Sequence, residues 1–121
     1  MNIRSKAIGC LDKSLSGPNQ EDHEIHMRDA ARGGLIDLAR TLACGDVDDP
    51  AKRLRTMVER LRADTVMVPA LAHLEHLGVD AAAVNTVCAV IECEQVPPRV
   101  WERGSIHNAD NVAARELAWH S

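Results

Sequence analysis

The stretch 81-AAAVNTVCAVIECEQ-95 carries the strongest structural signal in the chain. Its apolar residues fall into two stripes at helical spacing, one with Val84, Val87, Cys88 and Ile91 and the other with Ala82, Ala89, Cys93 and Val96. Asp80 precedes the stretch as an N-cap residue, and Pro97-Pro98 ends it. Because a helix that is apolar on two sides is buried on two sides, the pattern predicts a central helix near residues 80–95.

Helical spacing of apolar residues continues outside this stretch. It predicts helices over 2–15, 21–44, 50–64, 69–77 and 109–119, with a short extended piece at 64–68. Asp49-Pro50 has the N-cap and first-turn proline of a helix start. The fold class expected is therefore all-α, a compact bundle of five to seven helices that forms a single domain over residues 1–121.

The composition is that of a soluble globular domain. Of 121 residues, 45% are apolar and 26% are charged, and two Trp with no Phe or Tyr leave an aliphatic core that suits helix packing. No run approaches the roughly 18 apolar residues of a membrane span, and the N-terminus lacks the apolar core of a signal peptide. Four scattered cysteines favour reduced thiols, so a cytoplasmic location is expected. Eleven Arg against three Lys suggest a GC-rich bacterial or phage genome.

Two histidine pairs share one spacing, His23-x-x-His26 and His73-x-x-His76. Residues three apart lie on one helix face, so two such helices could supply four imidazoles to a metal ion. The usual zinc helix has spacing four in H-E-x-x-H, which this chain lacks. Metal binding by the two pairs is therefore an alternative hypothesis, and the other interpretation is that these histidines lie on the surface. No cofactor is expected.

Residues 84–106 suggest a second alternative, a DNA-binding regulator. The string WERGSI at 101–106 resembles the end of a recognition helix in small helix-turn-helix regulators, although Pro97-Pro98 interrupts the expected helix. From residue 80 to 121 the chain has six acidic residues and only three arginines, whereas DNA binding depends on phosphate contacts. The charge balance places this alternative second.

Signals of catalysis are weak. The chain has no Gly-x-Ser-x-Gly elbow and no phosphate-binding glycine loop. Cys88 and Cys93 are five residues apart, which places them on different helix faces as small buried apolar groups. Cys10 and Cys44 could meet only through tertiary packing. A non-catalytic protein is expected.

The principal functional expectation is a small regulatory or inhibitory protein that binds a protein partner and forms a homodimer. The helix over 50–64 has the one concentrated basic surface of the sequence, and Trp and Arg dominate interface hot spots. The expected partner-binding residues are Arg53, Arg55, Arg60, Arg62, Trp101, Arg103 and Trp119. The alternative interpretation is that the arginines of 50–64 form an ordinary solvated helix face and that the two Trp rings pack in the core.

Overall fold

A computed structural model of the chain describes residues 5–46 and 48–106. In chain order its elements are β1 (Lys6–Asp12), α1 (Lys13–Ser16), the 3-10 helix η1 (Gly17–Asn19), α2 (Gln20–Gly33), β2 (Asp37–Cys44), α3 (Pro50–Leu61), β3 (Thr65–Val68), α4 (Leu71–His76), α5 (Ala81–Val87), β4 (Ala89–Glu92) and β5 (Arg99–Trp101). None of the helices in these residues is long and apolar enough to cross a membrane. The expected helix at 109–119, with Trp119, lies outside the described residues.

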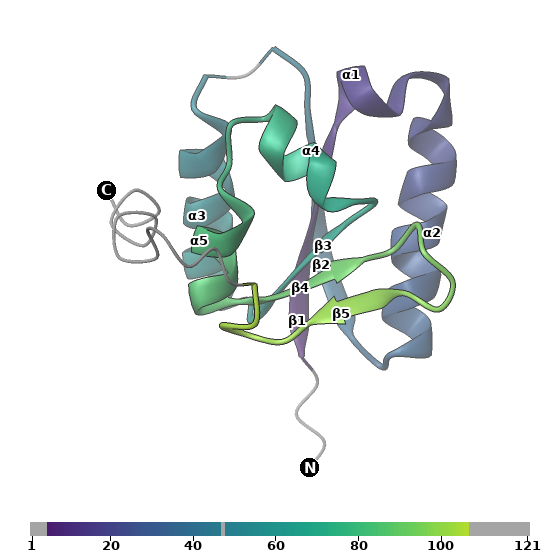
Figure 1. The fold of residues 1–121 in the computed structure, drawn as a ribbon, viewed down its shortest axis with the longest axis vertical. Coiled ribbons are helices and arrows are strands. Elements are labelled where there is room, and N and C mark those ends of the chain that lie inside the picture. Colours follow the sequence, from purple (N-terminus) through teal and green to yellow (C-terminus); the bar gives the residue numbers. More distant parts are fainter. Residues whose placement is uncertain (1–4, 47, 107–121) are drawn as a thin grey trace.

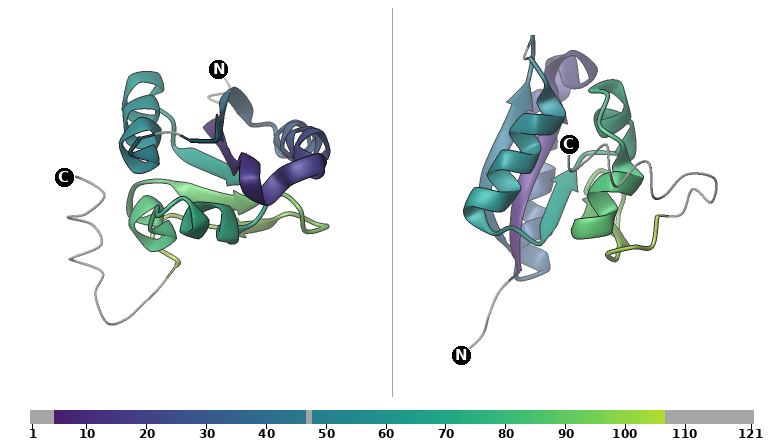
Figure 2. Two further views of the ribbon diagram at one scale, coloured as in Figure 1. Left: turned by 90° about the horizontal axis from the view of Figure 1, so that it is seen from above. Right: turned by 90° about the vertical axis from the view of Figure 1, so that its left-hand side faces the viewer.

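The strands form one five-stranded sheet in the order β2-β1-β3-β4-β5. Four strands are parallel, and β5 joins the edge antiparallel to β4. Helix α2 lies on one side of the sheet, with α3 and α5 on the other (Figure 1). The view from above shows the sheet between these helices (Figure 2). The protein is therefore α/β, and the prediction of an all-α bundle is wrong.

The core consists of two apolar layers, one on each side of the sheet. On one side, Leu54 of α3, Leu74 of α4 and Val84 of α5 pack against the sheet. On the other side, Met27 and Ala31 of α2 pack against it. Because both faces of the two central strands β1 and β3 are covered, almost every residue of these strands is buried.

This double coverage explains the wrong fold class. A parallel strand buried on both faces is a continuous apolar run, and such a run has the same periodicity signal as a buried helix. The predicted helix at 2–15 covers β1, and the predicted central helix near 80–95 divides into α5 and β4. The two apolar stripes of 80–95 thus arise from a short helix followed by a strand that is buried on both faces.

Capping residues predicted the helix starts more accurately than apolar periodicity predicted the element types. Helix α3 begins at Pro50, and the Asp49 side chain accepts a hydrogen bond from the Lys52 N–H, as the cap pattern predicted. Asp80 caps α5 by accepting hydrogen bonds from two backbone N–H groups. The extended piece at 64–68 is confirmed as β3. The predicted helix 21–44, however, ends at Gly33, and β2 follows it.

Residues 84–106 do not form a helix-turn-helix. After α5 the chain enters β4 and then β5, and Trp101 lies in this edge strand instead of in a recognition helix. The resemblance of WERGSI to a recognition helix is therefore not matched by its structure.

Candidate functional site

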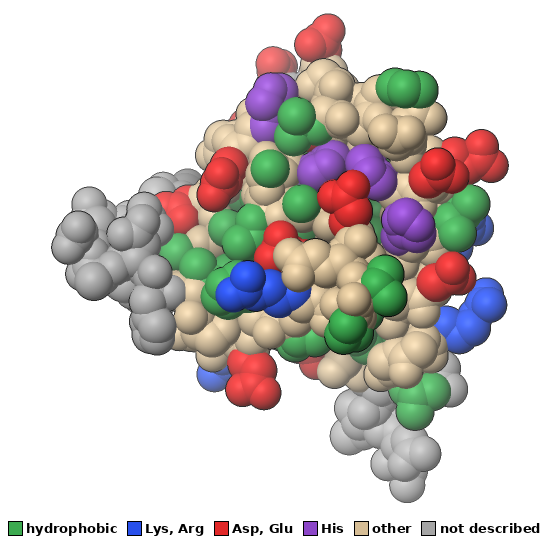
Figure 3. Space-filling view, turned by 45° about the vertical axis from the view of Figure 1, so that its right-hand side comes forward, with side chains coloured by type: hydrophobic (Ala, Val, Ile, Leu, Met, Phe, Trp, Pro, Cys, Tyr) green, Lys and Arg blue, Asp and Glu red, His purple; other side chains and the backbone are tan. Residues whose placement is uncertain are grey.

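A cluster of polar side chains lies at the carboxyl ends of the parallel strands. From β1 the chain goes to β2 on one side of it and returns to β3 on the other, so the helices that follow β1 and β3 pack on opposite faces. Such a change of direction opens a crevice beyond the strand ends, which is where open α/β sheets bind ligands. Histidine side chains gather there among acidic ones (Figure 3). This crevice is the candidate functional site.

Asp12, the last residue of β1, is the centre of the cluster. Its side chain is only 5% exposed. One carboxylate oxygen, Oδ1, accepts hydrogen bonds from the Ser14 backbone N–H at 2.9 Å and from the Ser14 Oγ at 2.7 Å. The other, Oδ2, contacts His76 Nδ1. Burial raises the pKa of Asp12, but the bonds from Ser14 and the contact with His76 outweigh it, so the pKa lies below its ordinary value.

The two partners of Asp12 face solvent. Ser14 is exposed in the first turn after β1, and the side chain of His76 is 55% exposed at the end of α4. Because the ring of His76 meets Asp12 through Nδ1, its Nε2 is the ring nitrogen directed away from that carboxylate. A hydroxyl and an imidazole thus share one buried carboxylate and remain open to a bound molecule.

A second set of polar groups lies behind this one. His73 Nδ1 accepts a hydrogen bond from the backbone N–H of Asp12 at 3.0 Å, and its ring lies edge-on to that of His23 with centroids 5.4 Å apart. His23 Nδ1 is 2.8 Å from Ser16 Oγ, and His23 Nε2 is 3.6 Å from Glu94 Oε1. Burial, followed by the neighbouring His23, lowers the pKa of His73 below its ordinary value.

The structure brings three of the four predicted metal ligands together but does not give them metal-binding geometry. His23, His73 and His76 belong to the cluster, whereas His26 is exposed and lines a groove between α2 and the strands. The Nδ1 atoms of all three clustered histidines have hydrogen-bonding partners. Within residues 5–46 and 48–106, no group of three or more His, Cys, Asp or Glu side chains could hold a metal ion.

Cysteines contribute one further pair beside Asp12. Asp12 and Cys44 are register partners on β1 and β2, and Cys10 lies two residues before Asp12. A hydrogen bond from Cys10 lowers the pKa of Cys44 to about 7. Tertiary packing therefore joins Cys10 and Cys44, while burial raises the pKa of Cys88 and Cys93 to about 11 and 12, as suits apolar core groups.

The predicted partner-binding residues occupy different parts of the fold. Arg53, Arg60 and Arg62 are exposed and Arg55 is half-buried, all on or next to α3, which contacts β1 and β2. Trp101 and Arg103 lie on and after β5, at the other end of the sheet order. Trp101 is half-buried, its Nε1 donates a hydrogen bond to Glu92 Oε1 at 2.9 Å, and Arg99 stacks on its ring. Trp101 therefore helps to hold the sheet edge together.

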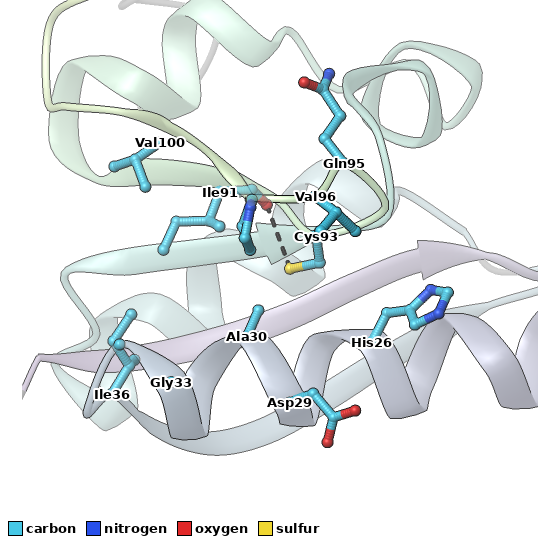
Figure 4. A pocket seen from close by; sticks show the side chains of 12 residues that line it. His26, Asp29, Ala30, Gly33, Ile36, Ile91, Cys93, Gln95, Val96 and Val100 are labelled. Carbon is cyan, nitrogen blue, oxygen red and sulfur yellow. Dashed lines mark hydrogen bonds between the residues drawn. The ribbon is translucent and has the colours of Figure 1, made fainter.

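An apolar groove lies on the α2 side of the sheet, between α2 and the segment from β4 to β5. It has a volume of about 560 Å³. Ala30 and Ile36 point from the α2 side toward Ile91 and Val100 of the strands (Figure 4). Val96 on the rim is 96% exposed and Val100 is 57% exposed, so apolar side chains of this groove are open to solvent.

Comparison of the chain with family models, with curated proteins and with solved structures gave no match. The function has to be argued from the site itself.

Sequence reasoning missed Asp12, Ser14, Ser16 and Glu94. The signal for Asp12 is present: an acidic residue ends the apolar run IGCL, as polar site residues do at the carboxyl end of a buried strand. The signal is lost once residues 2–15 are interpreted as one helix, because Asp12 then falls on a solvated helix face.

Proposed function

We propose that this protein is a group-transfer enzyme or hydrolase in which Ser14 is the nucleophile, Asp12 accepts its proton and His76 holds the other oxygen of Asp12. One observation carries the proposal: the exposed Ser14 hydroxyl donates to a buried carboxylate whose other oxygen contacts His76. Helix capping by Asp12 accounts for the bond from the Ser14 N–H. Capping requires neither the hydroxyl nor the imidazole on the same carboxylate.

The geometry supports a short proton path. As Ser14 Oγ forms a bond to an electrophilic carbonyl carbon or phosphorus, its proton passes to Oδ1 of Asp12, which acts as the general base. His76 donates its Nδ1–H to the other oxygen, Oδ2, and so holds the carboxyl group in place. As the bond between the transferred group and the leaving group breaks, Asp12 gives the proton to the leaving group, and water or a second acceptor then releases the transferred group from Ser14.

A fluorophosphonate probe tests this proposal without knowledge of the substrate, because it reacts with activated serine hydroxyls. We expect one adduct, located by peptide mass spectrometry on Ser14 and absent from Ser14→Ala. Asp12→Asn and His76→Gln should slow labelling at least about tenfold, since general-base assistance contributes about 100-fold or more. The matched control is Ser105→Ala, which removes an exposed serine outside the cluster. An unlabelled protein, or equal labelling of Ser14→Ala, would contradict the proposal.

The apolar groove favours a second candidate function, binding of a protein surface, with a second copy of this chain as the occupant. Apolar side chains line it, and Val96 and Val100 are exposed at its rim. We expect a dimer mass in sedimentation velocity and a monomer mass for Val100→Asp. Leu35→Asp, an equally polar change of an exposed residue that does not line the groove, should stay dimeric. A monomeric parent protein contradicts this candidate.

A further inference from the structure

His73 holds the backbone at the end of β1, where the strand has passed β3 and still pairs with β2. Pairing between β1 and β3 runs from Ala7 to Gly9, so the end of β1 extends past that neighbour. There the N–H of Asp12 donates to His73 Nδ1, across 61 positions of sequence. Both partners are buried. This bond joins the first turn of α4 to the residue whose carboxylate holds Ser14 and His76.

The bond requires a neutral ring, because a protonated imidazole has no acceptor nitrogen. Groups from every surrounding element bear on that state: His23 on α2, Asp12 on β1, Glu94 after β4 and His76 on α4. Burial and the two histidines disfavour the charged form, whereas the two carboxylates favour it. The net effect lowers the pKa of His73 below its ordinary value of 6.5.

His23 supports this arrangement from behind. Its Nδ1 meets Ser16 Oγ, in a hydroxyl that is itself buried, and its Nε2 faces Glu94. The hydrogen bond to Ser16 orients the ring, which meets His73 through an edge-to-face contact. The orientation of His73 is thereby set by α2 as well as by α4.

We propose that His73 is a positioning residue for the Ser14–Asp12–His76 site, acting as a neutral hydrogen-bond acceptor that fixes the backbone of Asp12. This inference rests on the proposed function. It assigns His73 no contact with substrate. When the ring takes up a proton, it loses the acceptor, Asp12 is released from α4, and the bonds of its carboxylate to Ser14 and His76 weaken. The site is thus competent only while His73 is neutral.

The state of His73 can be read by long-range ¹H–¹⁵N NMR of the whole protein at pH 7.5. We expect the tautomer with a proton on Nε2 and a bare, hydrogen-bonded Nδ1. A proton on Nδ1, or a ring that is charged at this pH, would overturn the inference whatever the activity of the protein.

Substitution at His73 then tests positioning. In His73→Ala, carboxyl ¹³C NMR should show the pKa of Asp12 rising toward its ordinary value of 3.8, because Ser14 and His76 hold the carboxylate less well. His73→Asn offers an amide oxygen as acceptor and should restore part of the shift, which keeps the test valid if the alanine variant folds poorly. His26→Ala, an exposed histidine outside the cluster, should leave Asp12 unchanged.

The probe reaction separates this inference from the proposed function. Labelling of Ser14 should decline in the parent protein as His73 becomes protonated, and this decline should be absent from the pH profile of His73→Asn. Unchanged titration of Asp12 in His73→Ala, with Ser14 still labelled in the parent, overturns the positioning role alone. A shifted Asp12 titration with no labelling of Ser14 in any variant overturns the proposed function and leaves the role of His73 in the backbone intact.

Discussion

The two His-x-x-His pairs have the same spacing, and in both pairs the two histidines differ from each other in burial. In each pair the first histidine is buried and hydrogen-bonded, and the second is exposed. His23 and His73 meet edge to face, whereas His76 turns to Asp12 and His26 to the apolar groove. Spacing along a helix therefore places two rings on one side, but the partners that tertiary packing brings to each nitrogen decide what the ring does.

Replacement of the buried and the exposed histidine of α4 should give the largest contrast. His73→Leu leaves the buried N–H of Asp12 without an acceptor and should lower the free energy of unfolding by about 1–3 kcal/mol. His76→Leu removes a half-exposed ring and one partner of the Asp12 carboxylate, which keeps its bonds to Ser14, so it should cost less, about 0.5–1 kcal/mol. Urea denaturation measures both. If the two variants lose the same free energy of unfolding, the difference in burial and hydrogen bonding between His73 and His76 has no effect on stability, and the comparison fails.

The same contrast within α2 should be smaller, because the hydrogen bond lost there joins two side chains. His23→Leu leaves the buried Ser16 hydroxyl without its partner and should cost about 1 kcal/mol. Adding Ser16→Ala should recover part of this loss, since both polar groups are then gone. His26→Leu serves as the exposed control. A double variant less stable by the full sum of the single effects would contradict a bond between Ser16 and His23.

The pH dependence of stability should show the smallest effect. Because the folded protein holds the pKa of His73 below the 6.5 of an ordinary histidine, the unfolded chain binds more protons just below that value. Stability should therefore fall as the pH drops below 6.5. The urea midpoint, measured between pH 7.5 and 5.5, should decrease in the parent protein and decrease less in His73→Asn. A midpoint that rises over this range would have the wrong sign.

Much of the local structure could be read from the sequence. Asp49-Pro50 and Asp80 mark real helix starts because capping depends on residues within one turn. Cys88 and Cys93 are buried, as predicted, although they follow α5 and β4 and do not lie on one helix. By contrast, the apolar runs of β1 and β4 could not be distinguished from helices, since a strand covered on both faces loses its alternating pattern.

The candidate site was the least predictable part. Ser14 and Asp12 are close in the sequence, but His76 reaches Asp12 across 64 positions and Glu94 reaches His23 from beyond β4. These contacts exist because parallel pairing brings the carboxyl ends of β1, β3 and β4 to one edge of the sheet. An all-α fold has no such edge. The histidines were therefore interpreted either as metal ligands or as surface residues.

By itself, the sequence determined an aliphatic core, capped helices and histidines at a repeated spacing, because each of these depends on composition or on neighbours within a turn or two. Only the tertiary structure decided that the apolar runs of β1 and β4 are strands and that His73, His76 and Ser14 share Asp12. The reason is physical. Burial on both faces removes the alternating pattern by which a strand is recognised in a sequence. The order of strands in the sheet decides which segments lie side by side, and therefore which side chains can form hydrogen bonds with one another.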